Sequence, residues 1–105
     1  MGYAKERVKL EKLSTKVSAL TNYDDKSLTS ITDIFEQYSH SIRILKNKSP
    51  EIFMDQYKNE LEEVKLLKRA LKVGEEADRE DNFAKYRDSL LAALNSAITL
   101  IKGTV

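Results

Sequence analysis

The chain contains no cysteine and no tryptophan, and it has only one proline, three glycines and one histidine. Without cysteine it can form no disulfide, no thiolate metal site and no cysteine nucleophile. With His40 as its one histidine, it also lacks the ligands of an ordinary zinc site and the members of a serine triad. We therefore predict no metal, no cofactor and no catalytic site, so that the protein is not expected to be an enzyme.

The chain also has no large excess of positive or negative charge and no long hydrophobic run. Its formal net charge is +1, whereas a nucleic-acid-binding domain usually carries a strongly basic surface. Four lysines, Lys5, Lys9, Lys12 and Lys16, line one flank of the first expected helix, which is typical of a solvated face. The start of the chain leads into no apolar stretch, which predicts a cytoplasmic protein without membrane insertion.

Helix-forming residues dominate what remains, because Leu, Lys, Glu and Ala are abundant and breakers are rare. A chain of 105 residues is of the usual size for one domain, so we predict a single domain over residues 1–105. Apolar residues recur at alternating spacings of about three and four, which indicates amphipathic helices. The most regular such stripe comprises Leu28, Ile31, Phe35, Tyr38, Ile42 and Leu45.

Turn and cap residues divide the chain into four expected helices. The first runs from about Tyr3 to Leu20, and the residues from Thr21 to Asp25 form a turn with N-cap candidates. Ser49-Pro50-Glu51 reads as the N-cap and first turn of the third helix. Gly74 predicts a further turn, although one long helix through it is an alternative.

These helices predict an all-α, antiparallel (up-down-up-down) four-helix bundle. On the third helix we expect one core stripe of Met54, Tyr57, Leu61, Val64, Leu67 and Leu71. Three tyrosines, Tyr38, Tyr57 and Tyr86, fall on core stripes, and their hydroxyls are expected to reach the bundle edge. The residues predicted to be core are Leu28, Phe35, Tyr38, Leu61, Val64, Leu90, Leu94 and Ile98.

His40 is predicted to face solvent, opposite the stripe of its helix. The sequence His40-Ser41-Ile42-Arg43 resembles the local pattern of histidine phosphotransfer domains, which are also four-helix bundles of this length. The resemblance implies that His40 accepts the phosphoryl group, Ile42 anchors the core and Arg43 steadies the phosphoryl oxygens. That family usually has a glycine next, where this chain has Ile44, and a bulky residue there opposes docking of a receiver domain.

Several apolar residues fall outside the core stripes and suggest a binding surface. Leu66 and Val73 are expected to project from the side of the third helix opposite its stripe, with Ile52 close to their line, and Ile44 leaves the stripe of the second helix. Two exposed apolar residues seven positions apart lie on the same face of a helix, and such a pair is better explained when another surface covers it. The leading hypothesis is therefore a regulatory or protein-binding bundle whose partner is another protein or a second copy, with no small-molecule substrate implied.

Overall fold

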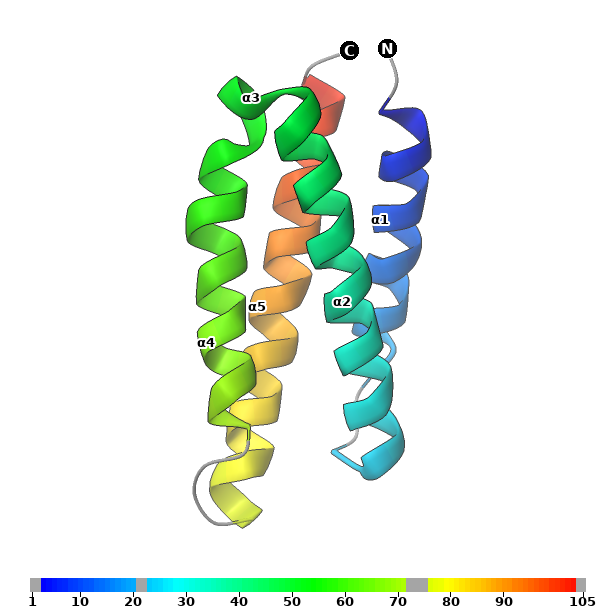
Figure 1. The fold of residues 1–105 in the computed structure, drawn as a ribbon. Helices are drawn as coiled ribbons and strands as arrows, with labels where there is room; N and C mark the ends of the chain where they lie inside the picture. Colours follow the sequence, from blue (N-terminus) through cyan, green and yellow to red (C-terminus); the bar gives the residue numbers. More distant parts are fainter. Residues whose placement is uncertain (1–2, 21–22, 72–75, 104–105) are drawn as a thin grey trace.

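The computed structural model describes residues 3–20, 23–71 and 76–103, and all of the regular secondary structure in these ranges is helical. Four antiparallel rods form the bundle, as predicted (Figure 1). Its principal extents are 45 × 23 × 17 Å. None of the helices in the described ranges is long and apolar enough to cross a membrane. In chain order the helices are α1 (Ala4–Ser18), α2 (Asp25–Lys48), α3 (Pro50–Asp55), η1 (Gln56–Glu60), α4 (Leu61–Ala70) and α5 (Glu76–Gly103).

The third rod is one helix that contains a π-helical turn. The segments α3, η1 and α4 follow one another without a gap, and η1 has π-helical hydrogen bonding. The fourth rod, α5, packs alongside α4 as a separate antiparallel helix, so the long-helix alternative is wrong. The predicted turn at Gly74 itself lies outside the described residues.

The starts of the second and third rods follow the local sequence. The Asp24 carboxylate accepts a hydrogen bond of 2.7 Å from the Ser27 backbone amide, which caps α2 and lowers the pKa of Asp24. Pro50 is the first residue of α3 and Ser49 stands at its N-cap position. The Ser49 side chain makes no capping hydrogen bond, however, because its hydroxyl is engaged by the hydroxyl of Tyr3.

Two side chains of α5 donate hydrogen bonds to backbone carbonyls at the C-terminal ends of α1 and α4. A guanidinium nitrogen of Arg87 donates to the carbonyl of Leu20, just beyond α1, at 3.0 Å. The amide of Asn82 donates to the carbonyl of Ala70, the last residue of α4, at 3.2 Å. Carbonyls at helix C-termini lack partners within the helix, so these bonds fasten α5 to both neighbours.

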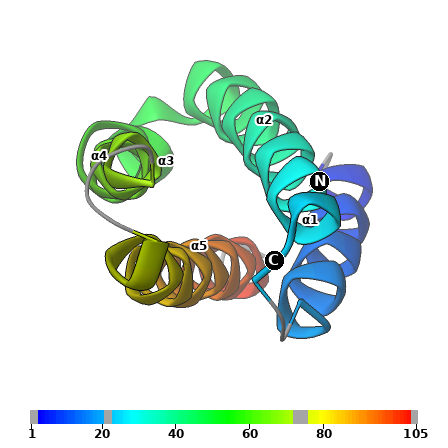
Figure 2. The ribbon, with the colours of Figure 1, turned by 90° about the horizontal axis from the view of Figure 1, so that it is seen from below.

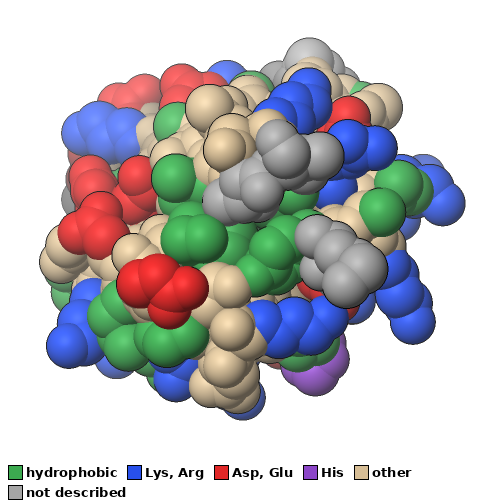
Figure 3. Space-filling model, turned by 90° about the horizontal axis from the view of Figure 1, so that it is seen from above, with side chains coloured by type: hydrophobic (Ala, Val, Ile, Leu, Met, Phe, Trp, Pro, Cys, Tyr) green, Lys and Arg blue, Asp and Glu red, His purple; other side chains and the backbone are tan. Residues whose placement is uncertain are grey.

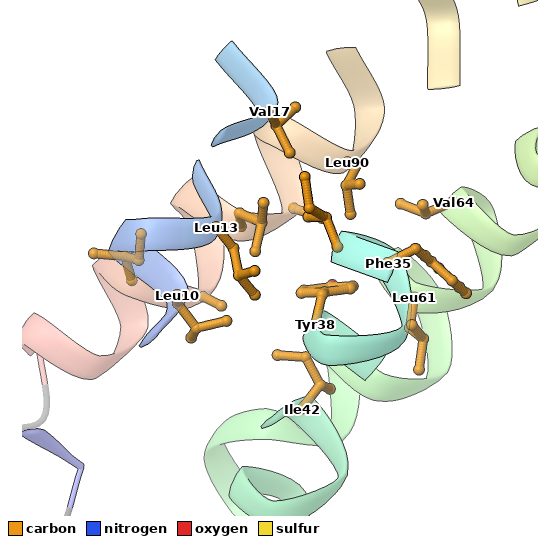
Figure 4. Close-up of a cluster of buried hydrophobic side chains, with 14 of the residues drawn as sticks. Leu10, Leu13, Val17, Phe35, Tyr38, Ile42, Leu61, Val64 and Leu90 are labelled. Atoms are coloured by element: carbon orange, nitrogen blue, oxygen red, sulfur yellow. The ribbon is translucent and has the colours of Figure 1, made fainter. Parts of the chain in front are cut away.

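The core is one cluster that draws on every rod. Figure 4 shows Phe35 of α2 beside Leu61 and Val64, with α1 contributing Leu10 and Leu13 on the other side. Of the eight residues predicted to form the core of the whole bundle, seven are buried: Phe35, Tyr38, Leu61, Val64, Leu90, Leu94 and Ile98. Leu28 is only half-buried against the cluster, since it lies in the first turn of α2, close to the end of the bundle.

The π-helical turn changes which residues of the third rod face the core. Phe53 is buried before the turn, Gln56 is buried as its first residue, and Leu61 is buried directly after it, five residues beyond Gln56. An α-helix would space such residues by three or four, and a π-turn accommodates one more. Met54 and Tyr57, predicted to lie on the core stripe, are therefore only half-buried. Leu67 and Leu71 of the same predicted stripe are also half-buried, and they pack against the core cluster.

The burial of Ile52 also differs from the prediction. This residue was expected near the line of exposed residues on the third helix, but it is half-buried and packs against the core cluster. It belongs to α3, which lies at the end of the bundle viewed in Figure 3. In that view hydrophobic side chains gather at the centre, with charged side chains of both signs around them.

Candidate functional site

Leu66 is the most exposed large hydrophobic residue in the described part of the chain, with 60% of its surface accessible. It lies in α4, whose opposite side buries Leu61 and Val64. The structure thus places Leu66 on the outer side, as the sequence pattern predicts. Val73, its expected neighbour, lies outside the described residues.

Ile44, the third residue of the predicted partner surface, is half-buried on α2 and does not pack against the core cluster. It lies near the end of α2 that adjoins α3, whereas Leu66 lies toward the far end of α4. At a rise of about 1.5 Å per residue, the two are separated by roughly 18 Å along the bundle axis. The fold therefore does not join Ile44 and Leu66 into one patch.

Val8 on α1 is the other large hydrophobic residue that is exposed in the described ranges, at 45%. Together with Ala4 it lines a shallow depression whose remaining walls are Lys5, Lys9 and Lys12. The expected flank of lysines thus surrounds an apolar side chain. This environment makes Val8 a suitable comparison for Leu66.

His40 is exposed on α2, as predicted. Ile42, two positions on, is completely buried, and Arg43 is exposed. His40 and Arg43 therefore face solvent, whereas Ile42 between them lies in the core. Ile44 stands one turn after His40 on the same helix.

A buried polar network lies at the π-helical turn. The Gln56 amide nitrogen donates to the Tyr38 hydroxyl and to the Ala93 carbonyl, each at 2.9 Å. Both Tyr38 and Gln56 are almost completely buried. Burial raises the pKa of the Tyr38 phenol, and the nearby Glu60 carboxylate raises it further, whereas the hydrogen bond from Gln56 opposes the shift.

Tyr86 is buried like Tyr38, but its hydroxyl is not hydrogen-bonded within the described residues. Burial raises the pKa of this phenol, with a smaller contribution from the Glu36 carboxylate. The prediction that these tyrosine hydroxyls reach the bundle edge is therefore wrong for Tyr38 and Tyr86, because the aromatic ring of each lies too deep in the core.

Two hollows flank α4, and the charged side chains that line them are acidic in one and basic in the other. Beside α5, a hollow is lined by Glu60, Glu63 and Asp88 together with Ser89, and Ser96 donates to Glu60 at 3.1 Å. Across the described ranges, no group of three His, Cys, Asp or Glu side chains could hold a metal ion. On the side toward α2, a second hollow is lined by Phe35, Lys65, Lys68 and Arg69.

Two lysines cover aromatic rings between α2 and the third rod. The ammonium of Lys46, on α2, lies 4.5 Å from the ring centroid of Tyr57, on η1. The ammonium of Lys68, on α4, lies 4.8 Å from that of Phe35, on α2. Sequence reasoning missed this arrangement, although the basic spacing at 65, 68 and 69 marks one flank of a helix.

Comparison with known proteins does not assign this chain to a family. Neither a protein-family model, nor a curated protein, nor a solved structure matches this chain significantly. Functional inference therefore depends on the surfaces described above.

Proposed function

We propose that this chain is a non-enzymatic, cytoplasmic protein-binding module with a regulatory role, and that the outer face of α4 around Leu66 is its binding surface. The supporting observation is the 60% exposure of Leu66 in a chain that buries most of its large apolar residues. Burying the exposed part of a leucine would stabilise a complex by about 1 to 2 kcal/mol. Leu66 thus has the character of an interface anchor.

The surroundings of Leu66 support this assignment. Lys65 and Glu62 form an exposed ion pair at 3.5 Å, and Arg69 is exposed one turn further along α4. Charged groups around a single apolar anchor resemble the polar rim of a protein interface. The expected partner is another protein or a second copy of this chain.

The decisive substitution is Leu66→Lys, with Val8→Lys as its matched control. Leu66→Lys should leave helicity and the unfolding midpoint unchanged while lowering the mass measured by light scattering, or abolishing binding to a purified partner. Val8→Lys adds the same charge at the other exposed apolar residue and should have neither effect.

A photo-crosslinking amino acid at position 66 gives the independent readout, because it identifies what touches this face. Crosslinks that form from position 66 but not from position 8 support the proposal. If Leu66→Lys changes neither mass nor partner binding, and position 66 yields no specific crosslink, the outer face of α4 is not the binding surface.

The exposure of His40 beside the buried Ile42 favours one alternative, a phosphotransfer bundle with His40 as the phosphoryl acceptor. This function requires a phosphorylated donor protein to dock over His40. Incubation with phosphodonors separates it from a binding module, because only the phosphotransfer function requires His40 to become phosphorylated.

A further inference from the structure

The hollow between α2 and α4 has an aromatic floor and basic walls. Phe35 of α2 forms the floor, Lys65, Lys68 and Arg69 of α4 form the walls, and the open hollow has a volume of about 290 Å³. Lys68 is held over the Phe35 ring, so at least one of the cations is already positioned. A preorganised charged group loses less conformational freedom when a ligand binds.

The two helices that flank this hollow, α2 and α4, are spaced apart. α2 packs against α3 and η1, whereas its backbone makes little contact with α4. Figure 2, which looks along the bundle from the opposite end to Figure 3, shows α2 and α4 standing apart. Side chains, rather than direct helix packing, therefore occupy the space between them.

The cations of the hollow have few acidic partners. Lys65 pairs with the exposed Glu62 at 3.5 Å, whereas neither Lys68 nor Arg69 forms an ion pair with a carboxylate of the described residues. Glu36, which follows Phe35 on α2, is exposed and likewise forms no ion pair with them. Three like charges around one hollow repel one another, and a bound anion would relieve that repulsion.

From this arrangement we infer that the hollow between α2 and α4 binds a phosphate monoester. A phosphate carries close to two negative charges near neutral pH and offers several strong acceptor oxygens. The guanidinium of Arg69 can donate two parallel hydrogen bonds to it, and the two lysines add point charges. The volume is at the lower limit for small-molecule sites, about 300 Å³, which suits a phosphate and a small attached group.

The test titrates ¹⁵N-labelled protein with phenyl phosphate and follows the amide resonances by NMR. Saturable shifts should cluster at Phe35, Lys65, Lys68 and Arg69, and acetate should produce weaker ones. The double variant Lys68→Gln/Arg69→Gln should weaken binding by about tenfold or more, since two charge-assisted donors are lost. Its matched control, Lys5→Gln/Lys12→Gln, removes the same charge from α1 and should bind as the unmodified chain does.

Two further measurements identify the source of the phosphate and test whether each variant is folded. A short phosphotyrosine peptide that binds more tightly than phenyl phosphate indicates a phosphorylated protein, and equal binding indicates a free ester. The amide spectrum of each variant also reports whether it is folded. The proposal is overturned if the shifts do not saturate. It is also overturned if the α1 control variant weakens binding as much as Lys68→Gln/Arg69→Gln does.

Discussion

The amide nitrogen of Gln56 lies 2.9 Å from the buried hydroxyl of Tyr38 and donates a hydrogen bond to it. This bond joins the π-helical turn of the third rod to α2, and a second bond from the same nitrogen reaches the Ala93 carbonyl on α5. Tyr86, equally buried, has no such partner among the described residues. The core therefore contains two similar phenols in opposite hydrogen-bonding states.

This contrast predicts different effects of removing each hydroxyl. Tyr38→Phe should destabilise the fold by about 1 kcal/mol, because it breaks a buried hydrogen bond. Tyr86→Phe should be neutral or stabilising, since it removes a buried hydroxyl that has no partner. Urea unfolding of both variants checks the prediction, and an equal loss of stability in the two would show that the Tyr86 hydroxyl has a partner.

The same two phenols predict alkaline destabilisation. Their pKa values are raised in the folded state, so above a pH of about 10 the unfolded chain loses protons that the native chain retains. Stability should therefore fall as the pH rises through this range. The double variant Tyr38→Phe/Tyr86→Phe should show a shallower decline in unfolding midpoint between pH 9 and 11, roughly spanning the unperturbed phenol pKa. An unchanged decline would contradict the assignment.

Phe35 should be among the most sensitive core positions. Phe35→Ala is expected to cost about 3 to 5 kcal/mol of unfolding free energy, as is usual for a buried phenylalanine. The substitution also removes the ring beneath Lys68. Chemical denaturation provides the measurement, with Ile44→Ala on the same helix as the control expected to have a small effect. A wild-type midpoint for Phe35→Ala would mean that the α2 stripe is not buried.

The π-helical turn predicts that one residue can be deleted from the third rod. Lys58 is exposed within η1, and removing it places Gln56 four residues before Leu61, which is the spacing of a regular α-helix. The deletion variant should fold with near-native helicity and melting temperature. Deleting the exposed Asp33 from the regular helix α2 should instead unfold the protein, because it rotates half of the stripe away from the core. Unfolding of both variants would contradict this account of η1.

His40 should remain unmodified in the presence of phosphodonors. The side chain is exposed, but the bulky Ile44 occupies the position that is usually a glycine in phosphotransfer domains. Incubation with small phosphodonors and phosphorylated receiver domains, followed by phosphate analysis, provides the assay. An acid-labile phosphate that disappears in His40→Gln would favour the phosphotransfer function over the binding module.

The sequence alone determined the helices, their order and most of their buried faces. Leu10, Leu13 and Val17 of α1, which are spaced three and four residues apart, are buried, and Asp24 caps α2. It also marked Leu66 as an outward-facing residue. These features depend on spacing within one helix and on hydrogen bonds between near neighbours, which local sequence encodes.

Tertiary packing decided the rest. Burial of Phe53 and Gln56 in place of Met54 and Tyr57 requires a π-turn, and regular helical periodicity cannot reveal it. The placement of Lys68 over Phe35 likewise joins two helices that are distant in sequence. Which flank of a helix meets another depends on packing among all the rods, because each helix can bury its apolar stripe in more than one arrangement.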